Sequence, residues 1–243
     1  MSGAPYPNFP LQSYTPDGQT HFINKDYPGL QCIHENPRIF VVHDFLTAAE
    51  CDEVMAVGQE LGLPAARVNS ASGVDQEHRK SKSSAAWRRS RPDKFARLEF
   101  VRQRVQQLTR VSDNQLEVSQ VTKYDVGDYF KPHHDSYEAG FLHSKGRCPD
   151  GLGNRVVTVF VYLNDVNSGG QTRFTELEPQ LDVVPKQGMA CVFFPGLLKS
   201  ATHLGTAGGR APNTKHEGRP VLAGEKWIMQ QWCWSSTYLQ DQP

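Results

Sequence analysis

The segment YFKPHHDSY places two histidines and an aspartate in a row, as His133, His134 and Asp135. If the segment lies on a β-strand, side chains two positions apart share a face, so His133 and Asp135 point the same way and His134 points the other way. A further histidine from another strand would complete the two-histidine, one-carboxylate set that holds Fe(II) and leaves coordination positions open. By itself the H-x-D tripeptide is also typical of polar surface residues.

The second half of the sequence predicts rigid elements that could carry such a site. From Leu116 onward, short apolar runs such as RVVTVFVYLN, LDVVP and MACVFFP are separated by Gly, Pro, Asn and Asp. Short strands with this punctuation are typical of a β-sandwich or jelly roll. No repeat with a period of 20–50 residues is present.

Two amphipathic helices are predicted ahead of this β core. In TAAECDEVMAVGQELGL, Thr47 and Glu50 have the spacing of a capping box. In PDKFARLEFVRQRVQQL, Pro92 stands near the first turn, where proline is tolerated. Apolar residues line one side of this second helix: Phe95, Leu98, Val101, Val105 and Leu108. The polar stretch between the helices, Asn69–Arg91, is predicted to be a long loop or flexible hairpin, and residues 1–36 an irregular N-terminal arm.

Composition excludes several classes of partner. The 243 residues include 26 Lys plus Arg and 26 Asp plus Glu, so bulk charge does not favour binding to nucleic acid or to an anionic membrane. No apolar run is long enough to span a bilayer, and the N-terminus lacks the pattern of a signal peptide. The five cysteines are scattered without a C-x-x-C pair, which indicates free thiols. We therefore expect a cytoplasmic protein.

Several motifs in a fixed order resemble a known family. Upstream of the tripeptide the pattern is Y-x-x-G-x-x-F-x-x-H-x-D, from Tyr124 to Asp135. GGQTRF follows at Gly169–Phe174, and HEGRPVLAGEKWIMQQW places His216 ten residues before Lys226. This arrangement resembles the prolyl 4-hydroxylases among the Fe(II)/2-oxoglutarate-dependent dioxygenases, from about Pro37 to Trp232.

The resemblance implies the roles of the site residues. His133, Asp135 and His216 would hold the iron, and Lys226 would pair with the far carboxylate of 2-oxoglutarate. A dianionic cosubstrate in a dry barrel requires such a fixed cation. The other residues implied at the cosubstrate are Tyr124, Thr172 and Trp232, although core packing is an alternative for Trp232 and is favoured for Trp227.

A second histidine competes for the place of the third iron ligand. His203 lies in SATHLGTAGG, upstream of an unusually long segment that precedes His216. Only His216 has the proline and the lysine at the matching offsets, so we prefer His216.

The resemblance also implies contacts with the substrate. Arg155 matches an arginine near the peptide, although a surface arginine at a strand end is the alternative. HRKSKSSAAW resembles the family's lid over the peptide, with Arg79, Ser81 and Ser83 in register, although a solvated loop is the alternative. Phe130 stands where the family commonly has a substrate-facing tyrosine, and GRCPDGLGN is an insertion at the rim. Both differences argue against collagen-like substrates in particular.

The sequence therefore predicts an α+β, mainly β protein: a double-stranded β-helix (jelly-roll) core with supporting N-terminal helices, and a catalytic domain over residues 37–243. The resemblance implies a dioxygenase that hydroxylates peptidyl proline like the procollagen-proline enzymes, using O2 and 2-oxoglutarate and forming hydroxyproline, succinate and CO2. Ascorbate (vitamin C) is the reductant it implies. The alternatives are the same cofactors with another residue or a small molecule as substrate, and a non-catalytic jelly-roll binding module. The oligomeric state is left open.

Overall fold

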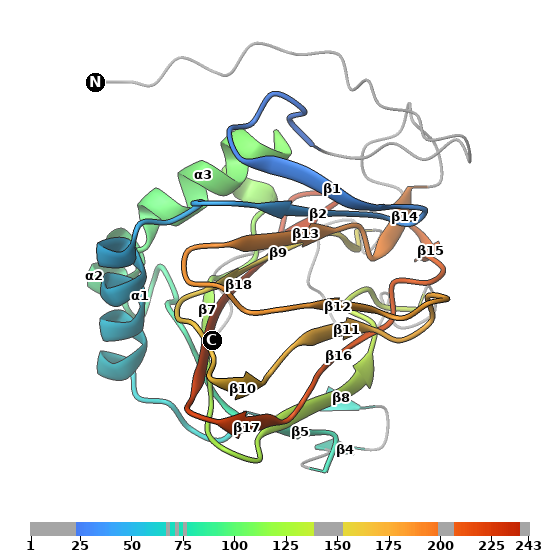
Figure 1. Cartoon of the computed structure of the whole chain (residues 1–243). Helices are drawn as coiled ribbons and strands as arrows, with labels where there is room; N and C mark the ends of the chain where they lie inside the picture. Colours follow the sequence, from blue (N-terminus) through green and yellow to red (C-terminus); the bar gives the residue numbers. More distant parts are fainter. Residues whose placement is uncertain are drawn as a thin grey trace.

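The computed structural model describes residues 23–66, 69–70, 73–74, 77–138, 153–198 and 207–238. Its largest element is a sheet of seven strands in which every neighbouring pair is antiparallel (Figure 1). In spatial order the strands are β1 (Leu30–Glu35), β2 (Arg38–Val42), β13 (Ala190–Phe193), β9 (Arg155–Tyr162), β18 (Lys226–Trp234), β7 (Gln120–Tyr124) and β6 (Lys82–Ala85).

A second, five-stranded sheet faces the first. Its strands in order are β12 (Leu181–Val183), β11 (Thr172–Phe174), β16 (His216–Gly218), β8 (Tyr129–His133) and β5 (Arg79–Lys80). Three further two-stranded sheets are formed by β10 (Ser168–Gly169) with β17 (Val221–Ala223), β14 (Gly196–Leu198) with β15 (Ala207–Arg210), and β3 (Asn69–Ser70) with β4 (Gly73–Val74). Two facing antiparallel sheets of this kind confirm the predicted double-stranded β-helix core.

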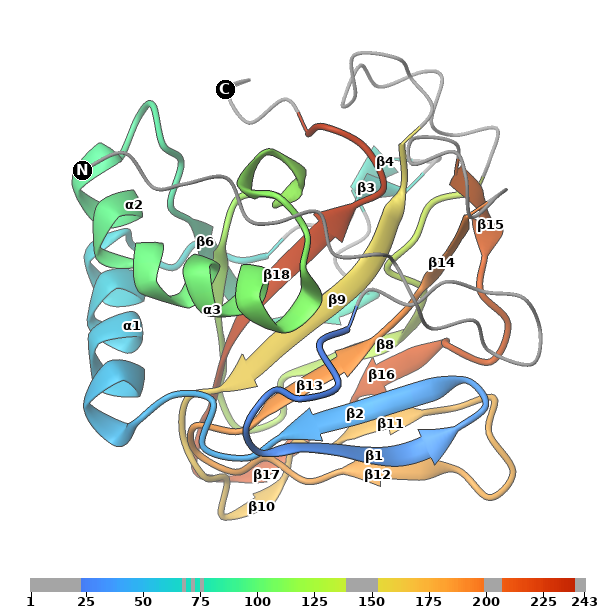
Figure 2. The ribbon, with the colours of Figure 1, turned by 90° about the horizontal axis from the view of Figure 1, so that it is seen from above.

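Helices cover the outer face of the seven-stranded sheet, as Figure 2 shows. They are α1 (Ala48–Glu60), α2 (Pro92–Arg97) and α3 (Glu99–Thr109), followed by the short 3₁₀ helix η1 (Asp113–Gln115). The predicted capping box is present in α1: the Thr47 side chain accepts from the Glu50 amide, and the Glu50 carboxylate accepts from the Thr47 amide.

The central strand β9 is apolar on both faces because both faces are covered. In β9, Val157, Val159 and Val161 pack toward the helices, while Phe160 and Tyr162 join the cluster between the two sheets. The same alternation places Trp227 on the helix side of β18, which agrees with the predicted core role of this residue. The continuous run RVVTVFVYLN is therefore a central strand buried on both sides.

Three predicted elements differ from the structure. The stretch Asn69–Arg91, predicted to be a long loop or flexible hairpin, contributes β5 to the five-stranded sheet and β6 to the seven-stranded sheet. The second predicted helix is broken at Leu98, whose backbone (φ −97°, ψ 0°) leaves the helical region, so α2 and α3 are separate helices. Leu98 is nevertheless buried, as are the other four apolar residues predicted on that side. Residues Leu30–Glu35, predicted to be irregular, form β1, the edge strand of the large sheet, because their backbone pairs with β2. The division of the chain at residue 36 stays a prediction. Within the described residues, no helix combines the length and the apolarity that a bilayer span requires.

Candidate metal centre

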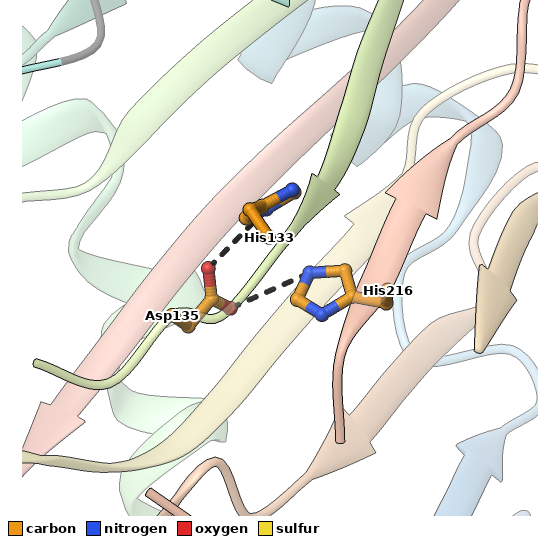
Figure 3. Close-up of side chains that lie close together, drawn as sticks. All are labelled: His133, Asp135 and His216. Carbon is orange, nitrogen blue, oxygen red and sulfur yellow. Dashed lines mark ion pairs between the residues drawn. The ribbon is translucent and has the colours of Figure 1, made fainter. Parts of the chain in front are cut away.

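Two neighbouring strands of the smaller sheet bring the predicted ligands together. His133 ends β8 and is the register partner of His216 on β16, although 83 positions separate them in the chain. Asp135 follows the end of β8, and its carboxylate faces both imidazoles, with one oxygen toward each ring (Figure 3). One ligating atom from each of the three residues lies within 4.8 Å of the others. The structure therefore brings together the three side chains that the sequence analysis predicted as a ligand set.

Hydrogen bonds orient both imidazoles toward Asp135. His133 Nδ1 lies 2.8 Å from the Lys131 carbonyl, and His216 Nδ1 lies 3.1 Å from the Thr214 carbonyl. A carbonyl oxygen only accepts, so each Nδ1 carries the proton and each Nε2 presents a lone pair. These Nε2 atoms lie 3.6 and 3.8 Å from the two Asp135 carboxylate oxygens. Lone pairs thus converge on one point from three residues, an arrangement that a bound cation stabilises.

Burial and charge favour the protonation states that a metal needs. Burial, followed by the neighbouring His216, holds the pKa of His133 well below its ordinary value. Burial by itself raises the pKa of Asp135, but His216 and His133 more than offset this, and the pKa is lowered. The Nε2 atom of His133 is buried and has no hydrogen-bond partner within the described structure. A neutral His133 imidazole, the His216 imidazole and an ionised Asp135 carboxylate offer two nitrogens and one oxygen, the donor set of an Fe(II) facial triad, so the residues fit this metal.

A stack of side chains supports His133 from behind. The Phe130 ring lies parallel to the His133 ring, with centroids 3.5 Å apart and planes inclined by 13°. The Arg79 guanidinium lies over the Phe130 ring, 4.7 Å from its centroid. Because β5 pairs with β8 through Arg79 and Phe130, this stack ties the predicted lid segment to a predicted ligand strand.

Lys226 is a buried lysine without an anionic partner among the described residues. Its side chain donates to the Gly170 carbonyl at 2.7 Å, and its Nζ lies 5.3 and 5.5 Å from the Tyr124 and Tyr162 ring centroids. The residue is 2% exposed, and desolvation lowers the pKa of its amine to about 7, although Cys191 opposes this shift. Such a group is ready to take up a carboxylate, whose charge would restore the ammonium form.

The predicted cosubstrate residues divide between two ends of the interior. Thr172 accepts a hydrogen bond from the Tyr162 hydroxyl at 2.9 Å, which joins it to the Lys226 end together with Tyr124. Trp232 lies six positions along β18 from Lys226, about 20 Å in an extended strand. Its indole Nε1 is buried without a hydrogen-bond partner in the described structure, and its ring packs against Arg155. Trp232 therefore lies toward the opposite end of the strand from Lys226.

Arg155, predicted as a substrate contact, has protein partners for all of its guanidinium nitrogens. Nε and Nη2 donate to the two carboxylate oxygens of Glu117 at 2.8 and 2.7 Å, and Nη1 donates to the Asp135 carbonyl at 3.3 Å. Burial opposes protonation, but the ion pair with Glu117 outweighs it and raises the pKa of Arg155. Arg155 thus supports the backbone of Asp135, and its contact with a substrate stays a prediction.

Arg79 and Ser81, the other predicted substrate residues, lie buried in a cluster of hydroxyl groups. Arg79 Nε donates to Ser81 Oγ at 2.8 Å and Nη2 donates to Thr122 Oγ1 at 3.1 Å. Ser83 Oγ lies 3.0 Å from the same Thr122 hydroxyl. Within the described part of the chain no carboxylate forms an ion pair with Arg79, so its charge is met only by neutral groups and by the Phe130 ring.

Sequence reasoning missed three residues that the structure places at the site. They are Glu117, the ion-pair partner of Arg155, Thr158, which donates to Asp135 at 2.8 Å, and Tyr162, which bonds Thr172. The sequence held a signal for two of them. Thr158 and Tyr162 bring hydroxyl groups into an otherwise apolar strand, and because an even number of positions separates them, both side chains lie on the same face of that strand. The competing ligand His203, as well as His143 and most of the insertion GRCPDGLGN, lies outside the described residues.

Sequence comparison connects this chain with oxygenases. The profile of the 2OG-Fe(II) oxygenase superfamily matches residues 119–234, which include all three predicted ligands and Lys226. Probable prolyl 4-hydroxylase 8 of Arabidopsis thaliana is 29% identical over 220 residues, covering 84% of this chain and 70% of the relative. Prolyl 4-hydroxylase subunit alpha-1 of Mus musculus is 30% identical over 203 residues, but the match spans only 34% of that longer subunit.

Solved structures share the fold. A viral collagen prolyl hydroxylase from Paramecium Bursaria Chlorella virus-1, in its 2OG complex, superposes with a TM-score of 0.58 at 22% identity, over 81% of this chain and 95% of that one. A prolyl hydroxylase from Trichoplax adhaerens, solved with a hypoxia inducible factor peptide fragment, gives a TM-score of 0.52 at 16% identity, over 83% of each chain. At these identities the likeness is one of architecture.

Proposed function

Because this chain belongs to the 2OG-Fe(II) oxygenase superfamily, we propose that it is a prolyl 4-hydroxylase, which hydroxylates proline in a peptide or protein. The observation that carries the proposal is the convergence of His133, Asp135 and His216 within a barrel that also buries Lys226, for which the described residues supply no anionic partner. The proposed catalytic domain covers residues 37–243.

The proposed roles follow from the contacts of each side chain. His133, His216 and Asp135 hold Fe(II), which when bound supplies the activation of O2 and the oxidative decarboxylation of 2-oxoglutarate. Lys226 binds the far carboxylate of 2-oxoglutarate, and Tyr124, Thr172 and Tyr162 line the pocket around that ammonium group. Their packing excludes water, which strengthens the charge pair. None of these residues needs to transfer a proton. Ascorbate is the proposed reductant.

On the substrate side we place Arg79, Ser81 and Phe130. Among the residues that the structure describes, the buried Arg79 guanidinium has only hydroxyl and aromatic partners, so peptide carbonyl oxygens are suitable additional acceptors. Phe130 provides an apolar ring beside His133, against which a pyrrolidine ring can pack. Because Phe130 lacks a phenol, the proline would be held by contacts and by backbone hydrogen bonds rather than by a hydroxyl at this position.

The test is succinate release in the presence of Fe(II), 2-oxoglutarate and ascorbate, with and without a proline-rich peptide, and with mass spectrometry for the added oxygen atom. Peptide-stimulated turnover is the expected result. Turnover only with other substrates would refute proline as the target, and no turnover under any condition would favour the binding module. His133→Ala should abolish the signal. His134→Ala is the matched control, because His134 is a neighbouring histidine that does not belong to the cluster of converging ligand atoms.

A further inference from the structure

The Asp135 carboxylate has one partner outside the cluster of three ligands. Thr158 Oγ1 donates to Asp135 Oδ2 at 2.8 Å, and both residues are buried, at 0% and 5% exposure. Thr158 lies in the middle of β9, which is hydrogen-bonded to β13 on one side and to β18 on the other. A hydroxyl on a central strand is a rigid donor, because ladder hydrogen bonds on both sides fix its backbone.

This hydrogen bond makes the two oxygens of the carboxylate unequal. Oδ2 accepts the Thr158 proton, whereas Oδ1 is the oxygen that lies closer to a predicted ligand nitrogen, 3.6 Å from His133 Nε2. Oδ2 lies 3.8 Å from His216 Nε2. The main chain of Asp135 is held as well, because Arg155 donates to its carbonyl. Backbone and side chain of Asp135 are therefore both oriented by β9.

We propose that Thr158 is a positioning residue that holds Asp135 as a one-oxygen ligand through Oδ1; this rests on the proposed iron site. A carboxylate that bound through both oxygens would occupy one more coordination position. The keto acid needs two of the positions that the three protein ligands leave open, and O2 needs the last. By engaging Oδ2, the Thr158 hydroxyl keeps that last position available. A hydroxyl donor at residue 158 is thus a condition for binding cosubstrate and O2 together.

Cobalt(II), which resists oxidation by air better than Fe(II), is a suitable probe of this role in the whole protein. Thr158→Val removes the hydroxyl at nearly constant volume, Thr158→Ala removes it with less crowding should the valine variant fail to fold, and Thr158→Ser restores it. The measurements are Co(II) affinity by titration calorimetry, the visible absorption of bound Co(II), 2-oxoglutarate affinity of the cobalt-loaded protein, and thermal unfolding of the metal-free protein.

We expect Thr158→Val to weaken Co(II) binding by about 10- to 100-fold, the range found when groups that orient metal ligands are removed. The visible spectrum should also change, and 2-oxoglutarate should bind more weakly to the loaded variant. Thr158→Ser should match the wild type in Co(II) affinity, in the visible spectrum and in 2-oxoglutarate affinity. If the valine and alanine variants bound Co(II) and 2-oxoglutarate like the wild type, with an unchanged spectrum, the inference would be wrong even if they unfolded at a lower temperature. If the wild type itself bound no Co(II), the proposed function would fail first.

Discussion

Replacing Lys226 with methionine should have two effects of opposite sign, one on the stability of the ligand-free protein and one on the binding of 2-oxoglutarate. Methionine approximates the length of the lysine stem but carries no charge. The groups that face the ammonium are the Tyr124 and Tyr162 rings, the Cys191 thiol and the Gly170 carbonyl. None of them is an anion in its ordinary state at neutral pH, so the charge is uncompensated until a ligand arrives.

The stability effect can be worked from the pKa. Burial lowers the pKa of Lys226 from 10.5 to about 7. Between these pH values the unfolded chain holds a proton that the folded protein lacks, so the free energy of unfolding rises with pH in this window. The difference between the pKa of Lys226 in the unfolded chain and in the folded protein corresponds to roughly 5 kcal/mol of destabilisation. This destabilisation is fully present below about pH 7. Methionine removes this cost but leaves the Gly170 carbonyl without its donor, which costs about 1–3 kcal/mol. The net gain for the variant at pH 7 is about 2–4 kcal/mol.

The binding effect has the other sign. Removing one partner of a buried ion pair costs about 3–5 kcal/mol, so 2-oxoglutarate should bind to Lys226→Met at least about 100-fold more weakly. Because a bound dianion raises the pKa of the amine again, binding to the wild type at pH 8 should take up nearly one proton. Binding to the variant should take up none.

Chemical unfolding of the metal-free protein at pH 7 and pH 9 measures the first effect, and calorimetry with the cobalt-loaded protein in buffers of different ionisation enthalpy measures the second. Lys123→Met is the control: this half-buried lysine of β7 pairs with Asp125 and Glu225 near the surface, and its loss should change stability by no more than about 1 kcal/mol. A Lys226→Met protein that is less stable at pH 7 and binds 2-oxoglutarate like the wild type would refute the reasoning.

Two further predictions follow from the same interior. Arg155→Met should destabilise the protein by about 3–5 kcal/mol because Glu117 stays buried without its cationic partner. The double variant with Glu117→Gln should lose less stability. Equal losses in chemical unfolding would contradict a direct ion pair. Removing metal with a chelator should lower the unfolding temperature, since Co(II) at about 100 times its Kd adds roughly 2.7 kcal/mol. Scanning calorimetry should find that this shift disappears in His133→Ala and persists in His134→Ala, and a shift that survived in His133→Ala would place the metal elsewhere.

Features that depend on neighbouring positions could be predicted from the sequence. The Thr47–Glu50 capping box and the apolar side of the second helix are local patterns, because hydrogen bonds and contacts within a helix join residues three or four positions apart. The shared direction of His133 and Asp135 followed from strand geometry, and the ligand set was recognisable because His216 and Lys226 keep a fixed spacing. Each of these signals lies within a dozen residues.

Which residues contact the side chains of the site was decided only by the folded sheets. Arg155 carries the same charge whether it meets a peptide or a carboxylate, and only the approach of Glu117, from the segment before β7, assigns it to an ion pair. Thr158 is indistinguishable from its valine neighbours by β propensity, and its role emerges because the turn after β8 brings Asp135 against β9. Antiparallel pairing sets these contacts between segments that are distant in the chain, and a shift of register by one residue would turn every side chain to the opposite face.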